Sequence, residues 1–330
     1  MTRPFRRALV GAAFLATTAV GLFPEESEAQ PLSSERERGL KPKDSFRECT
    51  NCPVMVVVPA GSFTMGSPEG EKDRDKERDK HESPQHVVSF ERPFAVGKFV
   101  VTVDQFSAFV KATGHDAGTK CGTFEDGKVE LRDNRSWRKP GFRQKGSHPA
   151  ACLNWHDAKA YAAWVAKTTG KGYRLLTEAE WEYSARGRTK PGPAPRFHFG
   201  DDEKDMCKYG NGADQTAKKT VTGSGRWTFF SCSDGYAYTA PVGSFSANAF
   251  GLHDMHGNVL QWTEDCYHDS YNGAPVDGSA WISGDCSSRV LRGGAWYLGP
   301  RGLRAALRGW HPDDNRGDHQ GIRVARPLTP

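Results

Sequence analysis

NAFGLHDMHGNVLQWTED, residues 248–265, combines turn-forming residues, large apolar side chains and oxygen donors. Gly251, Gly257 and Asn258 can take a positive φ angle, and the apolar side chains between them can hold such turns against a core. Side-chain oxygens come from Asp254, Gln261, Glu264 and Asp265. Together with carbonyls exposed by tight turns, they suit a hard cation such as calcium. The stretch therefore predicts a rigid, irregular cation site, and the alternative is a buried polar turn without metal.

The first 29 residues have the composition of a secretory signal peptide. Three arginines precede an apolar run at residues 8–23, and small residues follow at Ser27 and Ala29. A membrane anchor is the alternative, but the run is shorter than a bilayer span and contains glycine and threonine. We expect cleavage near Ala29, a periplasmic or secreted mature protein, and no membrane span after cleavage.

Composition gives little support for a nucleic-acid partner. The formal charge is +5 over 330 residues, and no basic patch with interleaved aromatic residues marks a nucleic-acid groove. The alternating charges of residues 69–82 predict a solvated loop. Residues 30–52 read as a polar linker with a cysteine pair, mobile over residues 31–48. The length of the remainder leaves one or two domains open, and its Gly, Pro and Trp content indicates an α+β protein with much irregular structure.

The cysteine count is eight, and an even number in an exported chain favours disulfides over zinc. Because loop closure favours neighbours in sequence, we expect the pairs Cys121–Cys152, Cys207–Cys232 and Cys266–Cys286. Cys49 and Cys52 then form a pair of their own. A redox dithiol is the alternative for that pair, but Pro53 and an apolar run follow it instead of a helix start.

Several segments have clear secondary-structure patterns. Residues 55–58, 86–90 and 94–101 read as strands. A helix is expected after Thr102 or Asp104, and another after Asn154, with apolar residues at helical spacing. A third helix starts at Thr177, because Thr177 and Glu180 form a capping box. Trp181 and Tyr183 on that helix are expected in the core.

These motifs together resemble the formylglycine-generating enzyme, or sulfatase-modifying factor, family. The matching segments, in order, are VVVPAGSFTMGS (56–67), VTVDQF (101–106), HPAACLNWHDAKAYAAWVAKTTGKGYRLLTEAEWEYSARG (148–187), residues 248–265, RVLRGGAW (289–296) and GIRVAR (321–326). The resemblance implies a single domain over residues 53–327. It also implies an α+β fold related to C-type lectins.

The resemblance also implies where catalysis would take place. Enzymes of this family oxidise a cysteine of a substrate protein to formylglycine, using oxygen and copper(I) held by two thiolates, ligands that suit this metal. The family's Ser-x2-Cys-x4-Cys arrangement falls on Ala295, Leu298 and Leu303. Leucine cannot bind copper, so the family's catalytic residues are absent and copper is not an expected cofactor.

The family's calcium ligands are better matched. The first site corresponds to Asn211, Gly212, Asp234 and Tyr236, and the second to Asp254, Gly257, Val259 and Gln261. Gln261 replaces a glutamate that is usual in the family, which should weaken the second site. The resemblance therefore implies structural calcium.

Two functions follow from a family scaffold without its copper ligands. The first is an exported binding module for a protein or peptide. The second is a divergent oxidoreductase that uses other groups, for which histidines are available at His253, His256, His268, His311 and His319. Arginines and tryptophans near the former catalytic region predict a cationic, aromatic cleft for an acidic peptide or glycan: Arg292, Trp296, Arg301, Arg304, Arg308 and Trp310. The alternative is that these arginines form internal ion pairs.

Overall fold

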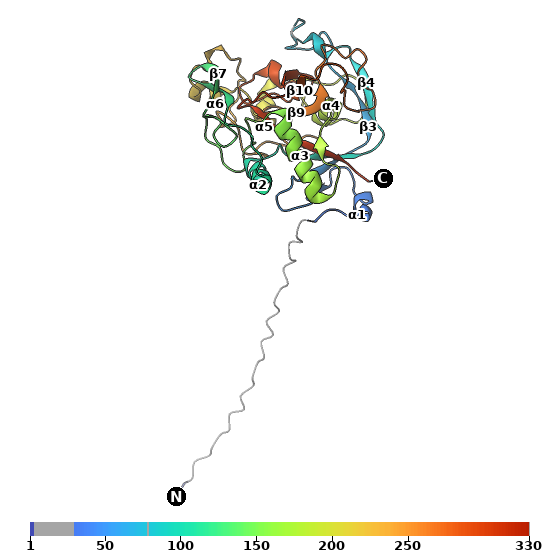
Figure 1. The fold of residues 1–330 in the computed structure, drawn as a ribbon, viewed down its shortest axis with the longest axis vertical. Coiled ribbons are helices and arrows are strands. Elements are labelled where there is room, and N and C mark those ends of the chain that lie inside the picture. Colours follow the sequence, from blue (N-terminus) through green and yellow to red (C-terminus); the bar gives the residue numbers. More distant parts are fainter. Residues whose placement is uncertain (3–29, 78, 330) are drawn as a thin grey trace.

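The computed structural model describes residues 1–2, 30–77 and 79–329. The signal peptide expected over residues 1–29 therefore lies almost entirely outside the described residues. Short strands and helices joined by long irregular segments make up the fold (Figure 1). This mixed architecture confirms the α+β prediction. No described helix is long and apolar enough to cross a membrane.

The strands form two sheets and two separate hairpins. The first sheet has the order β1 (Ser45–Phe46), β2 (Met55–Val58), β5 (Phe94–Gly97), β13 (Val324–Pro327) and β8 (Arg174–Leu175). The second has the order β11 (Arg308–Pro312), β10 (Ser288–Arg292), β9 (Leu260–Cys266) and β12 (Gln320–Gly321). The hairpins are β3 (Gly61–Met65) with β4 (His86–Phe90), and β6 (Cys121–Glu125) with β7 (Lys128–Arg132). They lie on opposite sides of the domain in Figure 1.

The five-stranded sheet is buried on both faces. Along β2, Met55 and Val57 belong to one apolar cluster, while Val56 and Val58 belong to another. Successive residues of a strand point to opposite faces, so a short run of apolar residues fills both. Residues of α2 and α3 contribute to the first cluster, and residues of α4 and the β3–β4 hairpin contribute to the second. A strand covered on both sides explains the uninterrupted run of valines.

The helices begin where capping residues predict. They are α1 (Ser34–Arg38), α2 (Val103–Thr113), α3 (Trp155–Thr169), α4 (Glu178–Arg186), α5 (Met206–Tyr209) and α6 (Gln215–Thr220). Short 3-10 turns are η1 (Lys80–Glu82), η2 (Glu203–Asp205), η3 (Ser224–Arg226) and η4 (Pro300–Leu303). Thr102, Asn154 and Thr177 are the N-caps of α2, α3 and α4, each in a reciprocal capping box. Trp181 and Tyr183 are fully buried, as expected.

The strand expected over residues 94–101 is shorter than predicted. It ends at Gly97, which pairs with Met55, the first residue of β2. The two residues before Met55 include Pro53, which has no N–H for a ladder. Because β5 pairs with β2 along its whole length, the ladder ends where this partner begins.

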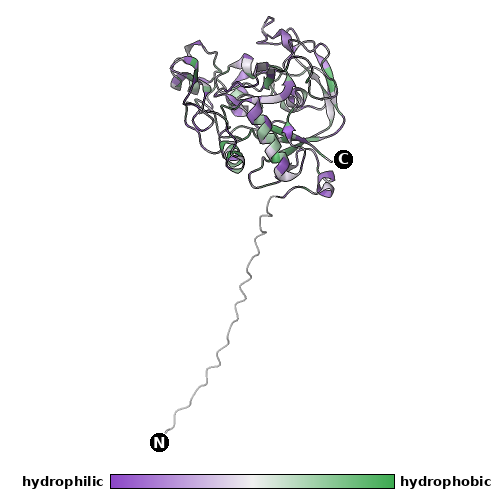
Figure 2. Cartoon of the chain, viewed as in Figure 1, coloured by the Kyte–Doolittle hydropathy of each residue, from purple (hydrophilic) through white to green (hydrophobic). Residues whose placement is uncertain are grey.

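The segment expected to be a mobile linker is part of the folded domain, which corrects that prediction. Glu37 of α1 and Glu48 are buried, and both form ion pairs with the buried Arg326 of β13 at 3.0 Å. The hydroxyl of Tyr173 also donates to Glu48 at 2.6 Å. Figure 2 shows α1 as a hydrophilic helix beside the C-terminal end. The segment has the composition of a linker because, besides Leu32 and Phe46 in the core, it buries the charged and paired residues Glu37 and Glu48.

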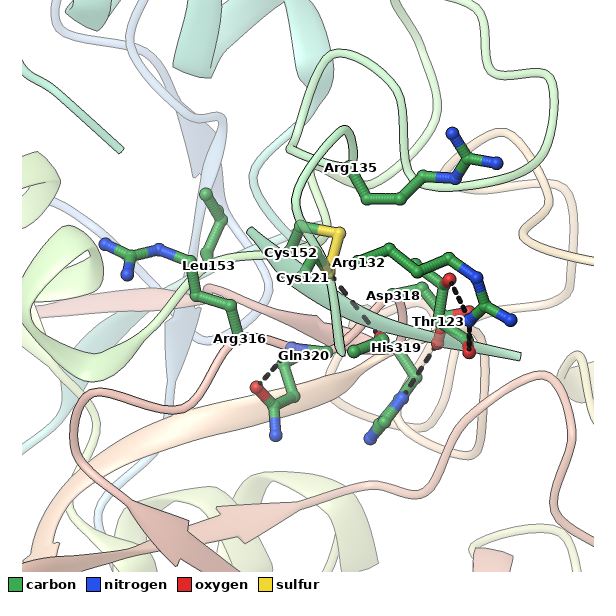
Figure 3. The surroundings of a disulfide bond; sticks show 12 residues. Cys121, Thr123, Arg132, Arg135, Cys152, Leu153, Arg316, Asp318, His319 and Gln320 are labelled. Atoms are coloured by element: carbon green, nitrogen blue, oxygen red, sulfur yellow. Dashed lines mark hydrogen bonds and ion pairs between the residues drawn. A yellow bond between two sulfur atoms is a disulfide. The ribbon is translucent and has the colours of Figure 1, made fainter. Parts of the chain in front are cut away.

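All four disulfides join the cysteines that sequence proximity predicted. The bonds are Cys49–Cys52, Cys121–Cys152, Cys207–Cys232 and Cys266–Cys286, and no described cysteine is free. The Cys121–Cys152 bond holds the β6–β7 hairpin against the segment before α3, next to residues 316–320 (Figure 3).

The stretch 248–265 forms the turns that its composition predicts. Gly251, Asp254, Gly257 and Asn258 all have positive φ. At Gly257 a Cβ atom would lie 1.8 Å from the carbonyl oxygen of Asn211, so only glycine fits this close approach. The chain then enters β9, the centre of the second sheet.

Candidate functional site

The three positions expected to hold catalytic residues follow β10, after a sharp turn at Gly293 and Gly294. Ala295 is fully buried in the main core. Leu303 is fully buried in an apolar cluster with Phe197, Met206 and Phe230. Leu298 is only partly buried and lines an open pocket. Leu298 is therefore an apolar part of the pocket lining and Leu303 is part of the core beneath it, and neither side chain offers a metal ligand.

This pocket, which we call the η4 pocket, has a volume of about 750 Å³. One wall is aromatic and includes Trp227, Phe229 and Tyr297. A second wall is charged and comes from residues 72–75 together with Glu203. Leu298 and residues 300–302 of η4 also line the pocket. A cavity of this size with one apolar and one polar wall has the character of a ligand site.

The rim of the η4 pocket carries charges of both signs. Lys72 pairs with Glu203 at 2.5 Å, and the buried Arg196 pairs with Glu203 at 3.1 Å. Arg226 is exposed and makes no ion pair with the described residues. The pocket is therefore not strongly cationic, which differs from the expectation for this region.

The expected cationic cleft is not formed, because its arginines point into the protein. Arg292 is fully buried and ion-paired with Glu182, also fully buried. Arg308 is fully buried and donates to both carboxylate oxygens of Glu178 at 2.7 and 3.0 Å. Trp296 is fully buried as well. Of the six proposed cleft residues, Arg301 and Trp310 alone are substantially exposed, at 40 and 42 %. The alternative of internal ion pairs is the correct one here.

Arg304 anchors the segment that forms the charged wall. Its fully buried guanidinium donates to Glu71 at 2.6 Å, to Asp79 at 3.0 Å and to Glu82 at 2.7 and 2.9 Å. Arg301 also donates to Asp79. The charged segment 69–82 is therefore clamped onto η4, which corrects the prediction of a solvated loop.

Asp79, His81 and Glu82 are the one group of three His, Cys or carboxylate residues in the described chain whose ligand atoms lie close enough together for a metal. Arg304 already occupies the space between the two carboxylates. The His81 ring lies within hydrogen-bond distance of the Arg308 carbonyl, at 3.2 Å. A guanidinium balances this buried charge, so the group does not fit a metal ion.

The first expected calcium site is brought together by the fold. The backbone of Gly212, the residue after Asn211, contributes a hydrogen bond to the Asp234 carboxyl. The side-chain oxygens Asn211 Oδ1 and Asp234 Oδ2 are buried without any hydrogen-bond partner among the described residues. The Asn211 amide nitrogen donates to the carbonyl of Tyr238 at 2.8 Å, which fixes the orientation of the amide. Burial, together with the charge of nearby Asp214, raises the pKa of Asp234 to about 8. Two orphaned oxygens are costly without a partner, and a hard cation would satisfy both.

The second expected site does not offer the same donors. Asp254 is fully buried; one of its oxygens accepts from the amide of Gly243, and the other from the side chain of Asn258. The side-chain oxygen of Gln261 accepts from Trp181 at 2.8 Å and from Arg323 at 2.7 Å. Both acceptor positions of that oxygen are used. Gly257 and Val259 lie in the same turn, yet this site lacks a free amide oxygen.

Arg323 places a permanent positive charge beside the second site. Its fully buried guanidinium donates to the carbonyls of Gly97 at 2.6 Å and His253 at 2.7 Å, in addition to Gln261. Burial lowers the pKa of Arg323 to about 10, which leaves it charged at neutral pH. The donor set of the second site therefore fits calcium less well than that of the first.

The histidines expected near the motifs are dispersed, with one exception. His256 is fully buried and lies 2.8 Å from the Leu303 carbonyl. His253 contacts Phe99, and His268 stacks on Trp281. His311 and His319, however, come together with ring centres 6.4 Å apart. They belong to strand β11 and to the segment before β12, which are not neighbours in the second sheet.

Sequence reasoning missed the aromatic wall of the η4 pocket and a buried histidine. Trp227 and Phe229 lie in a loop after η3 with no periodic pattern that marks them as site residues. His198 stacks on His256 with ring centres 5.0 Å apart, and neither of its ring nitrogens has a partner. Burial lowers the pKa of His198 to about 4. A nearby signal in the sequence was Cys207, because its predicted disulfide with Cys232 holds the chain that follows His198 in place.

Comparison with known proteins finds similar sequences and structures over most of the chain. Residues 41–328 match the family model described as "Sulfatase-modifying factor enzyme 1-like domain". The chain is 32% identical over 322 residues to a formylglycine-generating enzyme of Mycobacterium tuberculosis, covering 83% of this chain and 98% of the relative. It is 29% identical over 309 residues to a Mus musculus protein named "Inactive C-alpha-formylglycine-generating enzyme 2", covering 83% and 85%.

Solved structures show the same relationship. PvdO from Pseudomonas aeruginosa is 41% identical with a TM-score of 0.73, over 88% of this chain and 100% of that one. Treponema denticola variable protein 1, at 20% identity, has a TM-score of 0.59 over 83% of this chain and 95% of that one, and shows the fold alone. These matches confirm the family and the fold that the motifs indicated.

Proposed function

Because this chain belongs to the family of sulfatase-modifying factor enzyme 1-like domains, we propose that it is an exported binding module for a protein or peptide, stabilised by calcium and without copper-dependent formylglycine synthesis. The observation that carries the proposal is Leu298 in the wall of the η4 pocket. The pocket is open, but the residue that faces it at the copper-ligand position is apolar.

The disulfides strengthen the argument against copper. Every cysteine from Cys49 to Cys286 is bonded to another. Copper(I) in this family is held by thiolates, and a cysteine in a disulfide supplies none. No described cysteine could move into the pocket without first breaking a disulfide that joins two parts of the fold.

The η4 pocket supports a peptide as ligand. Its aromatic wall offers Trp227 and Phe229 for apolar contact, and its charged wall offers Lys72. The exposed Arg226 also lines the pocket. An extended peptide exposes carbonyls, amides and alternating side chains, so it can use both kinds of wall at once. The irregular loops around the pocket are also where family scaffolds carry binding functions.

The formylglycine prediction is tested with a peptide bearing the Cys-x-Pro-x-Arg motif, copper and oxygen. We expect no aldehyde by mass spectrometry beyond a copper-only control. The positive control is the triple variant Ala295→Ser, Leu298→Cys, Leu303→Cys, in which copper(I) binding should return. Aldehyde formation by the unmodified protein would overturn the proposal, because it would require chemistry that the pocket does not show.

Peptide binding is tested with a phage-displayed library of short random peptides panned on the mature protein. Selected peptides should lose affinity for the variant Arg226→Ala, Phe229→Ala, which alters the η4 pocket through partly exposed side chains. The matched control is Val276→Ala, an exposed apolar residue outside this pocket. Peptides that bind the unmodified protein, the double variant and the Val276→Ala control equally would show that the pocket is not the ligand site.

Calcium would act at Asn211 and Asp234, with carbonyls from Gly212 and Tyr236 completing the donors. The orphaned oxygens of the first two residues support this assignment. When bound, calcium would join the segments around residues 211 and 234, which have few regular backbone hydrogen bonds. Because the Gln261 oxygen already accepts two hydrogen bonds and Arg323 adds a positive charge, we expect Asp254, Gly257 and Val259 to hold calcium more weakly than the first site does.

The calcium proposal predicts a thermal midpoint that falls when a chelator is added. A ligand bound only to the folded state at about 100 times its Kd stabilises it by about 2.7 kcal/mol. Asp234→Ala should abolish most of the chelator effect. Asp133→Ala, at an 81% exposed side chain, is the matched control and should retain it. An unchanged midpoint after chelation of the unmodified protein would refute calcium as a structural cofactor.

The second candidate is a divergent oxidoreductase that modifies a protein or peptide substrate. It is supported by the open η4 pocket and by family relatives named formylglycine-generating enzymes at about the same identity as the inactive one. A peptide selected by panning distinguishes the two candidates. Recovery of that peptide with an altered mass after aerobic incubation favours the enzyme, and recovery of the unaltered peptide favours the binding module.

A further inference from the structure

His311 is a partly buried histidine without a partner. It lies on strand β11 opposite Arg289 of β10, so backbone pairing fixes its position. Its ring makes no hydrogen bond within the described residues, and its nitrogens are not among the buried unsatisfied atoms. The Arg289 guanidinium is directed elsewhere, onto the Trp155 ring at 4.0 Å and the Glu264 carbonyl at 2.9 Å. The His311 backbone is thus held in the sheet, and its imidazole is accessible and makes no hydrogen bond to the described residues.

His319 has the orientation of a metal-binding histidine. Its Nδ1 lies 2.9 Å from the Asp318 carboxylate, as Figure 3 shows by a dashed line. The other Asp318 oxygen accepts from the amide of Phe124 at 2.9 Å, which holds the carboxylate still. A carboxylate on Nδ1 fixes the tautomer and leaves Nε2 with a free lone pair. Metal-bound histidines in proteins commonly have such a carboxylate partner.

The two imidazoles are at a separation that a single metal can bridge. Their ring centres lie 6.4 Å apart, and a metal bound to an imidazole nitrogen at about 2.0–2.1 Å lies about 3.2 Å from the ring centre. Two imidazoles on opposite sides of one metal would therefore have ring centres about 6.4 Å apart. Two imidazole ligands without thiolates suit zinc, copper(II) and nickel(II). We infer that His311 and His319 form a binding site for a divalent transition metal, oriented by Asp318 and completed by water. This site is separate from the expected calcium sites and from the copper position of the family.

The position of this site connects it to the η4 pocket. The Tyr297 ring lies 5.0 Å from the His319 ring, and Tyr297 also lines the pocket. A metal between the histidines would therefore lie one side chain from the pocket. The site does not depend on the proposed peptide binding, because its ligands come from β11 and the segment before β12.

The experiment is titration calorimetry of the untagged mature protein with zinc, and separately with copper(II). Before the titration, a chelator removes all bound metal ions, and calcium is then added back. We expect one equivalent to bind. His311→Ala and His319→Ala should each weaken binding by more than about 100-fold, because each removes one of the two protein ligands. Asp318→Asn should weaken it by about 10- to 100-fold, because the carboxylate only orients a ligand. The thermal midpoint of each variant is measured in parallel to confirm that it is folded.

His156→Ala is the matched control, since His156 is a 58% exposed histidine 3.4 Å from the carboxylate of Asp313. This variant should bind both metals with unchanged affinity. The inference is wrong if a folded double variant His311→Ala, His319→Ala binds zinc and copper(II) as tightly as the unmodified protein. It is also wrong if His156→Ala weakens binding as much as His311→Ala does, since that would indicate surface histidines in general.

Discussion

Replacing Arg304 by Met should destabilise the protein more than any exposed charge substitution. The guanidinium is fully buried and donates to Glu71, Asp79 and Glu82. Removing it leaves Glu82 fully buried with no cation beside it, while Asp79 keeps Arg301. Breaking a buried ion pair by removal of one partner costs about 3–5 kcal/mol. At about 2–4 °C per kcal/mol for a domain of this size, the thermal midpoint should fall by roughly 6–20 °C.

The assay is thermal unfolding by circular dichroism, with hydrogen exchange of residues 66–85 as a local readout. Arg226→Met is the control, because Arg226 is exposed at the same pocket and should change stability by about 0.5 kcal/mol or less. Adding Glu82→Gln to Arg304→Met should recover part of the loss, since it removes the unpaired charge. If Arg304→Met and Arg226→Met melt at the same temperature, the ion pairs do not hold the charged wall onto η4.

Two further predictions concern buried charge. Burial keeps the folded pKa of both His81 and His198 at about 4, against an ordinary value of 6.5. The unfolded chain therefore binds protons that the folded chain does not, so stability is full above pH 6.5 and falls toward pH 4. His198→Phe should lose less stability over that range in thermal melts, and parallel curves would contradict this. Deleting residues 30–48 should cost at least about 3–5 kcal/mol, because Arg326 loses both Glu37 and Glu48. Melts should show partial recovery when Arg326→Met is added, and a truncated chain as stable as the full mature chain would refute the ion-pair argument.

Local signals allowed much of the fold to be predicted. The caps Thr102, Asn154 and Thr177 fix helix starts through hydrogen bonds between residues three apart, which sequence spacing specifies directly. The strands at residues 55–58 and 86–90 have the predicted bounds. The cysteine pairs were predictable because each closes a short loop. Motif order identified the family, since several independent segments had to agree.

The charged segments were predicted less well. Residues 31–48 and 69–82 have compositions typical of solvated chain, yet Glu48 and Glu82 are fully buried. Their partners, Arg326 and Arg304, are more than 200 residues away along the chain. A charge pattern does not reveal whether a distant opposite charge will arrive, so composition alone assigned both segments to solvent.

The sequence by itself determined the family, the α+β class and the disulfides, because these depend on residue identity and short spacing. Only the tertiary structure decided which polar groups remain free. It turned Arg292 and Arg308 inward to glutamates, left oxygens of Asn211 and Asp234 without partners, and brought His311 to His319. Each outcome depends on contacts between segments far apart in the chain. A buried polar group gains more free energy from a hydrogen-bond or ion-pair partner than local sequence preferences contribute.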